Sequence, residues 1–316
     1  MPKTSTSDGD FVAMVQRYGV AETARRLNVN QRNVFARRAT LERKLGIQIK
    51  APEYQNTNTR RAEDHPQRIL MDVENGEVLI GSDFHLWPGN RSTAFRAFVR
   101  YCKERQPKGI IANGDVLDFP KISRHPPIGW ENHPTIADEI EHGQRCLAEI
   151  EGAAPKTQKT WNLGNHDGRF ETRLATVAPE YARLNGFHLR DYFPEWLPAW
   201  STWINDDVVV THRYKGGIGA TRANALNSGK SMVTGHLHSA KVTPLTDYNG
   251  TRYGVDTGCI ADPDERAFVD YTEDNPKDWR SGFAVLTFRK GELLQPELVL
   301  VWDKDHVQFR GEIIRV

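Results

Sequence analysis

Asn162-Leu163-Gly164-Asn165-His166-Asp167-Gly168 follows a short apolar run and is the central one of five stretches with similar residue types. The other four, in chain order, are Asp83-Phe84-His85, Gly114-Asp115-Val116-Leu117-Asp118, Thr211-His212 and Gly235-His236-Leu237-His238. One such string alone is weak support for a site, whereas five in series are hard to sustain by chance. Carboxylate, amide and imidazole donors that recur at strand ends suit a hydrolytic site that holds two metal ions.

The segments before these motifs predict alternating strands and helices. Short apolar runs at 78–81, 110–112 and 160–163 precede the first three motifs, and helical patterns fill 92–103 and 135–151. This alternation is typical of α/β organisation. Sheets of this kind place their sites at the carboxyl ends of successive strands, where Asp83, Asp115 and Asn165 fall.

Two further strand patterns predict the rest of the sheet architecture. Residues 69–73 and 77–82, separated by Asn75-Gly76, indicate a hairpin with a tight turn. After Trp200 strands dominate and helix is scarce beyond about residue 226; the predicted strands are 200–205, 208–211, 232–234, 241–245, 251–255, 283–288 and 298–302. We therefore expect a second sheet packed on the first, with helices on the outside.

The order and residue types of the five motifs resemble the calcineurin-like metallophosphoesterase family over roughly residues 77 to 260. The resemblance implies an α/β fold of four layers, αββα, and two divalent metal ions, with manganese favoured and iron or zinc as alternatives. It implies that Asp115 bridges the two ions. By the same resemblance one ion would take Asp83, His85, Asp115 and His238, and the other would take Asp115, Asn165, His212 and His236.

The same resemblance indicates how the reaction would proceed. His166 would protonate the leaving group or stabilise the transition state, with Asp167 orienting its ring. Asp167 could equally cap a helix that begins near Arg169, and Asp118 could be a supporting residue or a simple loop acid. Arg169 and Arg213 follow motif residues directly and could hold phosphate oxygens. Thr211 occupies a position where the family usually has glycine. We expect this difference to alter the local packing but to leave the neighbouring ligand, His212, in place.

Tryptophans near the motifs could bind a substrate base, and the sequence suggests where. Trp130, in the segment between the second and third motifs, could stack a base at the entrance of the site. The aromatic run at 192–200, which ends at Trp200, favours core and edge packing over a base platform.

The first part of the chain has a different charge balance from the rest. Residues 1–61 hold 12 Lys/Arg and 5 Asp/Glu, whereas residues 62–316 hold 30 Lys/Arg and 36 Asp/Glu. Three short helices are predicted, with a first face over 11–15 ended by Gly19, a second helix at 20–27 and a third at 31–45. Asn28 lies in the turn, where asparagine tolerates a positive φ.

This three-helix pattern resembles a helix-turn-helix DNA-binding module. The third helix would then present Gln31, Arg32 and Asn33 to base edges, while Arg37 and Arg38 reach base edges or phosphates. The plainer interpretation is a three-helix cap with a solvated basic face, which would serve assembly.

The polar stretch at 51–66 predicts a linker, so we expect a helix-turn-helix domain at 1–50 and a metallophosphoesterase domain at 67–316. The three cysteines are widely spaced and odd in number, which favours reduced thiols in a cytoplasm. The sequence shows neither a signal peptide nor an apolar run long enough to span a bilayer, so we expect no membrane partner. It gives no indication of oligomeric state.

The leading functional hypothesis is a two-metal phosphoesterase acting on DNA, as a nuclease or a DNA-end phosphatase. The combination of a helix-turn-helix with this catalytic domain resembles proteins encoded by phages and prophages. One alternative is hydrolysis of small nucleotides or phosphoproteins, with the first helices used for assembly. Another class is a non-catalytic DNA-binding regulator, which the intact set of ligand residues argues against.

Overall fold

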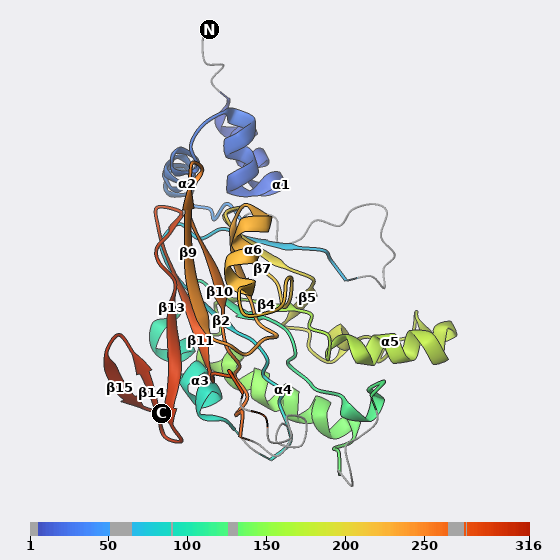
Figure 1. The fold of residues 1–316 in the computed structure, drawn as a ribbon. Helices are drawn as coiled ribbons and strands as arrows, with labels where there is room; N and C mark the ends of the chain where they lie inside the picture. The colour runs from blue at the N-terminus through green and yellow to red at the C-terminus, as the bar shows by residue number, and fades with distance from the viewer. Residues whose placement is uncertain (1–5, 51–64, 90, 126–131, 265–274, 276) are drawn as a thin grey trace.

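The computed structural model describes residues 6–50, 65–89, 91–125, 132–264, 275 and 277–316. In these segments two β-sheets pack face to face between layers of helix (Figure 1). Helices α3 (Thr93–Arg105) and α4 (Ile136–Ala153) cover the outer face of the larger sheet, and α6 (Ala220–Ser228) covers the smaller one. The predicted four-layer αββα fold is confirmed.

The larger sheet combines parallel and antiparallel pairing and has nine strands in the described part of the chain. Its spatial order is β15 (Glu312–Arg315), β14 (His306–Phe309), β13 (Glu297–Asp303), β11 (Gly282–Arg289), β2 (Gly76–Gly81), β3 (Gly109–Ala112), β4 (Gln158–Asn162) and β5 (Leu197–Ala199), with β12 (Glu292–Leu293) beside β11. The run from β2 to β5 is parallel. Because these strands are parallel, their carboxyl ends meet at one edge of the sheet.

The smaller sheet has six strands within the described residues. Their order is β1 (Ile69–Met71), β6 (Thr202–Ile204), β7 (Val208–Val210), β8 (Ser231–Thr234), β10 (Gly250–Asp256) and β9 (Lys241–Asp247). β7, β8 and β10 pair in parallel, so they also end together. The remaining helical segments are α5 (Gly168–Val177) and three short turns at Pro120–Ile122, Pro179–Tyr181 and Leu189–Asp191.

The predicted hairpin at 69–82 is wrong, because its two strands lie in different sheets. β1 pairs with β6 in the smaller sheet, whereas β2 pairs with β3 and β11 in the larger one. Met71 of the first strand and Ile80 of the second are both buried in the core between the sheets. A hairpin would have placed both strands in one sheet; here burial of both strands between facing sheets outweighs the local turn signal at Asn75-Gly76.

The amino-terminal helices have the predicted limits. α1 (Asp8–Leu27) is interrupted by non-helical backbone at Gly19, with φ 73° and ψ 176°, so it comprises two helices. Asn28 ends it with φ 52°, and α2 (Gln31–Leu45) follows. Their apolar faces form a separate small core that includes Phe11, Val34 and Leu41.

These helices contact the two-sheet body through a polar interface. Arg25 lies 3.0 Å from Asp206, and the Gln31 side chain donates to Asp207 at 3.3 Å. Asp72, which is nearly buried, accepts from the backbone N–H of Val20 at 3.3 Å. Arg38 lies 3.8 Å from the same carboxylate. Acidic groups of the body thus hold residues that the sequence assigned to DNA contact.

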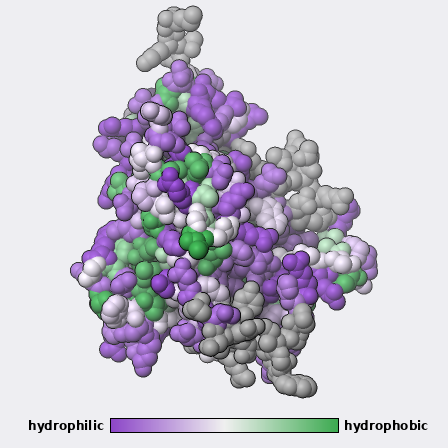
Figure 2. All heavy atoms as spheres, in the orientation of Figure 1, coloured by the Kyte–Doolittle hydropathy of each residue, from purple (hydrophilic) through white to green (hydrophobic). Residues whose placement is uncertain are grey.

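The other residues predicted to contact DNA have different surroundings. Arg37 donates to the Thr6 carbonyl at 2.6 Å and to Asp8 at 3.0 Å, whereas Arg32 and Asn33 are exposed. The surface over α1 and α2 is largely hydrophilic on the face shown in Figure 2. Residues 51–64 of the predicted linker lie outside the described segments, as does Trp130.

Two observations concern the cysteine thiols and the helices. All three cysteines are free and buried, in agreement with the predicted reduced thiols. In the segments that the structure describes, no helix has both the length and the apolar character needed to cross a membrane.

Asp167 joins the turns that follow β3 and β4. One carboxylate oxygen accepts the backbone N–H groups of Val116 and Leu117 at 2.9 and 3.1 Å. The other accepts the Trp161 indole N–H at 3.0 Å and the Gly164 N–H at 2.9 Å. The interpretation that Asp167 orients the His166 ring is therefore wrong. Asp167 does occupy the N-cap position of α5, as the alternative predicted, but its side chain makes no capping bond. Four buried N–H donors thus have this carboxylate as their acceptor, and these hydrogen bonds fix the direction of the Asp167 side chain.

We predict that Asp167→Asn lowers the free energy of unfolding by about 2–4 kcal/mol, because one amide NH₂ would face donors that need an acceptor. Urea unfolding monitored by circular dichroism measures the change. Asp191→Asn is the matched control, since Asp191 also accepts two backbone N–H groups but is exposed. Equal effects in the two variants would contradict this account.

Candidate metal centre

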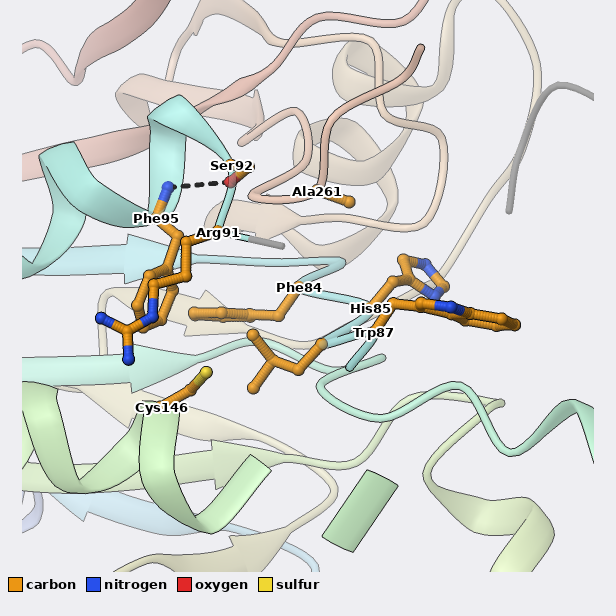
Figure 3. Close-up of a pocket in the computed structure, with 9 residues that line it drawn as sticks. Phe84, His85, Trp87, Arg91, Ser92, Phe95, Cys146 and Ala261 are labelled. Carbon is orange, nitrogen blue, oxygen red and sulfur yellow. Dashed lines mark hydrogen bonds between the residues drawn. The ribbon is translucent and has the colours of Figure 1, made fainter. Parts of the chain in front are cut away.

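The five motifs meet at the shared edge of the two sheets. Asp83 and His85 follow β2, Asp115 follows β3, and Asn165 and His166 follow β4. His212 follows β7, and His236 and His238 follow β8 of the smaller sheet. Figure 3 shows two side chains of the segment that follows β2: Phe84 points to Phe95 and Cys146 in the core, and His85 points the other way. This segment thus places a hydrophobic anchor beside a polar donor.

The backbone at the centre is strained at several positions. Asp83, His85, Asp115, His236 and His238 all have positive φ, between 39° and 71°. Such angles are uncommon for residues other than glycine, and they persist only where surrounding contacts impose them. Their concentration in the motifs distinguishes this edge of the molecule from ordinary loops.

Two motif glycines are required by close approach. A Cβ on Gly164 would lie 2.0 Å from a carboxylate oxygen of Asp115. A Cβ on Gly235 would lie 1.7 Å from the Ser82 hydroxyl and 2.5 Å from Asp83. Each glycine therefore lets the carboxylate of another motif pack against its own backbone.

The first group of donor atoms comprises Asp83, His85 and His238, all buried and with one atom from each within 4.8 Å of the others. His238 Nε2 lies 2.9 Å from an Asp83 oxygen, and His85 Nε2 lies 4.0 Å from it. The other Asp83 oxygen accepts the His236 backbone N–H at 2.8 Å. One carboxylate thus connects the first motif to the last.

The second group comprises Asp115, His212 and His236, again within 4.8 Å of one another. His212 Nε2 lies 3.1 Å from Asp115 and 4.0 Å from Asp83, so it lies between the two carboxylates. The structure brings together six of the residues that the sequence predicted as ligands. The seventh, Asn165, lies on the turn after β4 beside His166, whose backbone N–H donates to Asp115 at 2.8 Å.

The carboxylates and imidazoles of the two groups shift one another's pKa. Burial alone would lower the pKa of His212, but the carboxylates of Asp115 and Asp83 raise it to about 10. Conversely, burial would raise the pKa of Asp115, but the facing imidazoles, His212 first, lower it to about 2. The raised pKa of His212 shows that the two carboxylates favour positive charge between them.

The donor atoms fit divalent metal ions. The side-chain oxygen of Asn165 and Nε2 of His212 are buried without a hydrogen-bond partner. His212 Nδ1 lies 2.8 Å from the Asn113 carbonyl. Because a carbonyl only accepts, Nδ1 carries a proton. Nε2 faces an Asp115 oxygen 3.1 Å away, so a metal ion bound there would replace the second ring proton that the raised pKa favours.

A buried polar chain positions His212, and sequence reasoning missed it. The Asn162 amide donates to the Asn113 side chain at 2.9 Å and to the Val210 carbonyl at 3.1 Å. Asn113 donates in turn to the Thr211 carbonyl at 3.1 Å, and Thr202 donates to Asn162 at 2.8 Å. The available signal was an asparagine at the end of each of two strands: Asn113 directly after β3 and Asn162 as the last residue of β4. A buried amide at such a position needs hydrogen-bond partners.

Asp118, and not Asp167, contacts the His166 ring. His166 Nδ1 forms a short hydrogen bond with an Asp118 oxygen. The same oxygen lies 3.4 Å from His85 Nδ1. Burial would lower the pKa of His166, but Asp118 and then Asp115 raise it above its usual value. Asp118 therefore holds the ring and favours its protonated form, a role that the sequence had left undecided.

The two predicted substrate-binding arginines differ in their surroundings. Arg169 donates to the Asp118 carbonyl at 2.7 Å, and its other terminal nitrogen lies 3.3 Å from His166 Nε2. Arg213 is exposed and lines a hollow beside His212. Thr211 donates through its hydroxyl to the Trp200 carbonyl at 3.1 Å, so the expected change in packing takes the form of one added hydrogen bond.

Comparison with known proteins finds relatives in phages. The chain is 26% identical over 252 residues to the Gene 54 protein of Mycobacterium phage L5, covering 70% of this chain and 92% of that protein. It is 26% identical over 251 residues to the Gene 54 protein of Mycobacterium phage D29, with the same coverage. No family model matches the sequence.

Two solved structures are similar at low sequence identity. One is a protein serine/threonine phosphatase from Saccharomyces cerevisiae with similarity to human phosphatase PP5, at 14% identity and a TM-score of 0.34, covering 71% of this chain and 77% of that one. The other is the nuclease MPE of Pseudomonas putida, at 13% identity and a TM-score of 0.31, covering 69% and 86%. With scores this low, the layered fold and the site described above stand on the structure of this chain itself.

Proposed function

We propose that the chain is a metal-dependent hydrolase of phosphate esters, whose natural substrate is DNA. The observation that carries the hydrolase part is the juxtaposition of two donor groups, around Asp83 and Asp115, with the His166–Asp118 pair at their edge. Sites that bind two metal ions beside a general acid are suited to phosphoryl transfer.

The ligand assignment follows the two groups. One divalent ion would be held by Asp83, His85, Asp115 and His238, and the other by Asp115, Asn165, His212 and His236. When bound, the two ions would lower the pKa of a water molecule and neutralise the phosphoryl oxygens. The mixture of imidazole, carboxylate and amide donors suits manganese, iron or zinc, and we favour manganese.

His166 would act at the leaving oxygen. Its Nδ1 is held by Asp118, so Nε2 would deliver the proton once Arg169, whose guanidinium only donates and lies 3.3 Å from Nε2, turns to the substrate. The raised pKa keeps the ring protonated to higher pH, as a general acid requires. Arg169, 3.3 Å from this nitrogen, would hold a phosphoryl oxygen beside it.

The amino-terminal helices would bring the enzyme to DNA. This part of the chain is basic, with 12 Lys/Arg among residues 1–61, and α2 has exposed Arg32 and Asn33 at its start. Phosphate contacts from such a surface would concentrate the catalytic domain on its substrate. Gln31 and Arg38 would need to leave Asp207 and Asp72 before they could contact DNA.

A second candidate function follows from the same interface. Because Gln31 and Arg38 contact the body, the helices could serve assembly while the site hydrolyses small nucleotides or phosphoproteins. A non-catalytic DNA-binding regulator is disfavoured, since all seven proposed ligand residues are present and gathered at one edge.

We predict that the protein binds two manganese ions per chain and that His236→Ala and His238→Ala each weaken one of them more than tenfold, because each removes a donor from a different group. Equilibrium dialysis with elemental analysis measures stoichiometry and affinity. His306→Ala, an exposed histidine beside Asp303, is the control. Retention of both ions at full affinity in the first two variants would refute the assignment.

We predict that Asp118→Asn lowers kcat by about 10- to 100-fold and moves the alkaline limb of its pH profile to lower pH. The sign follows from the shift: Asp118 raises the pKa of His166, so its loss makes the ring deprotonate earlier as pH rises. Hydrolysis of an aryl phosphate ester across pH, with metal content measured in parallel, tests this. An unmoved limb at full metal occupancy would exclude His166 as the acid.

We predict that Arg32→Ala weakens duplex DNA binding and reduces the slope of log affinity against log salt by about 1, as loss of one phosphate contact requires. Fluorescence anisotropy over a salt series gives both quantities. Arg315→Ala, an exposed arginine in β15, is the matched control. If the two variants behave alike, the amino-terminal helices do not bind DNA through this residue.

A further inference from the structure

Trp200 directly follows β5, at the edge of the larger sheet where the candidate metal centre lies. β5 pairs in parallel with β4, and Leu163 donates its N–H to the Ala199 carbonyl at 2.8 Å. The next residue, Trp200, therefore lies beside the turn that carries Gly164 and Asn165. Four adjacent parallel strands thus end in this region, and the fourth supplies an aromatic side chain instead of a ligand.

The indole of Trp200 borders a hollow next to the second donor group. The hollow measures about 300 Å³ and is lined by Leu163, Gly164, Trp200, Thr211, His212 and Arg213. This volume is at the lower end of the range of about 300–1,000 Å³ that small-molecule sites occupy. Its walls combine a proposed metal ligand, an exposed cation and an exposed aromatic ring.

The main chain holds Trp200 at this position. Its N–H donates to the Pro66 carbonyl at 3.1 Å, and its own carbonyl accepts the Thr211 hydroxyl at 3.1 Å. The side chain nevertheless remains 51% exposed, whereas Trp196 in the same aromatic run is 1% exposed and donates its indole N–H to Glu151. The sequence interpretation of this run as packing thus describes Trp196, and Trp200 departs from it.

We propose that Trp200 stacks the nucleobase of the nucleotide adjacent to the scissile phosphate, with Arg213 holding the next phosphate along the strand. This inference rests on the proposed phosphoesterase function and names the substrate as a nucleotide chain. A base has a flat face for the indole and is linked to a phosphate, which suits the cation across the hollow. A phosphorylated serine offers the phosphate alone, so it would leave the ring unused.

The test compares binding of two short single strands that share one backbone. One is a thymidine trinucleotide with phosphorothioate linkages that resist hydrolysis, and the other is the same backbone without bases. Fluorescence anisotropy is measured with the full-length protein, with and without manganese. The variants are Trp200→Ala and Trp200→Phe, and the control is Trp302→Ala, a 62% exposed tryptophan in β13.

We expect Trp200→Ala to weaken binding of the base-bearing strand about tenfold and to leave the abasic strand unchanged. Trp200→Phe should retain most of the affinity, and Trp302→Ala all of it. With hydrolysable strands, Trp200→Ala should raise KM for the base-bearing substrate while kcat stays nearly constant, since the ring touches no reacting atom.

Three results would overturn the proposal: an equal loss for both strands in Trp200→Ala, no loss for either, or no binding of the base-bearing strand by the unaltered protein. A phosphoserine peptide whose binding also falls in Trp200→Ala would count against it too. If the unaltered protein binds both strands but hydrolyses no phosphate ester, the proposed hydrolase function is wrong. The comparison of the two strands still tests whether Trp200 stacks a base.

Discussion

The structure depends on two buried carboxylates, Asp83 and Asp115, held close to four imidazoles where the ends of two sheets meet. In water two such carboxylates would repel each other and each would be hydrated. Inside the protein they stay charged and close together only with opposite charge nearby. The fold supplies part of that compensation through backbone N–H donors, such as those of His166 to Asp115 and His236 to Asp83. The remaining demand is for cations, which is why strand ends, strained turns and close-packed glycines converge here.

Most residues of this centre could be predicted from the sequence because each can be recognised from its immediate neighbours in the chain. Each motif places polar donors directly after an apolar strand, and parallel strands bring such positions together without further knowledge. The limits of α2, the helix predicted from about residue 92 and the free thiols were predictable for the same reason. In each of these cases neighbouring residues determine the result.

Interactions between distant segments were not predictable. Asp118 lies three residues after Asp115, and Asp167 one residue after His166. Only the directions of their side chains separate a partner of His166 from a carboxylate that joins two turns. The β1–β2 segment resembles a hairpin because nothing local shows that the partners of β2 include β11, more than 200 residues later. Likewise, Arg38 of the amino-terminal helices contacts Asp72 of the two-sheet body, although the sequence predicted two separate domains.

The separation of β1 and β2 into different sheets has a consequence for synthesis of the chain. β2 leaves the ribosome early, but its neighbour β11 is made near the end, so the larger sheet stays incomplete while the first three motifs are already present. Asp83 and Asp115 are therefore synthesised before the histidines that follow β7 and β8, while the chain is only partly folded. A nascent chain of this kind exposes apolar strand edges for most of its translation, which makes production of the protein sensitive to the pace of elongation and to chaperones.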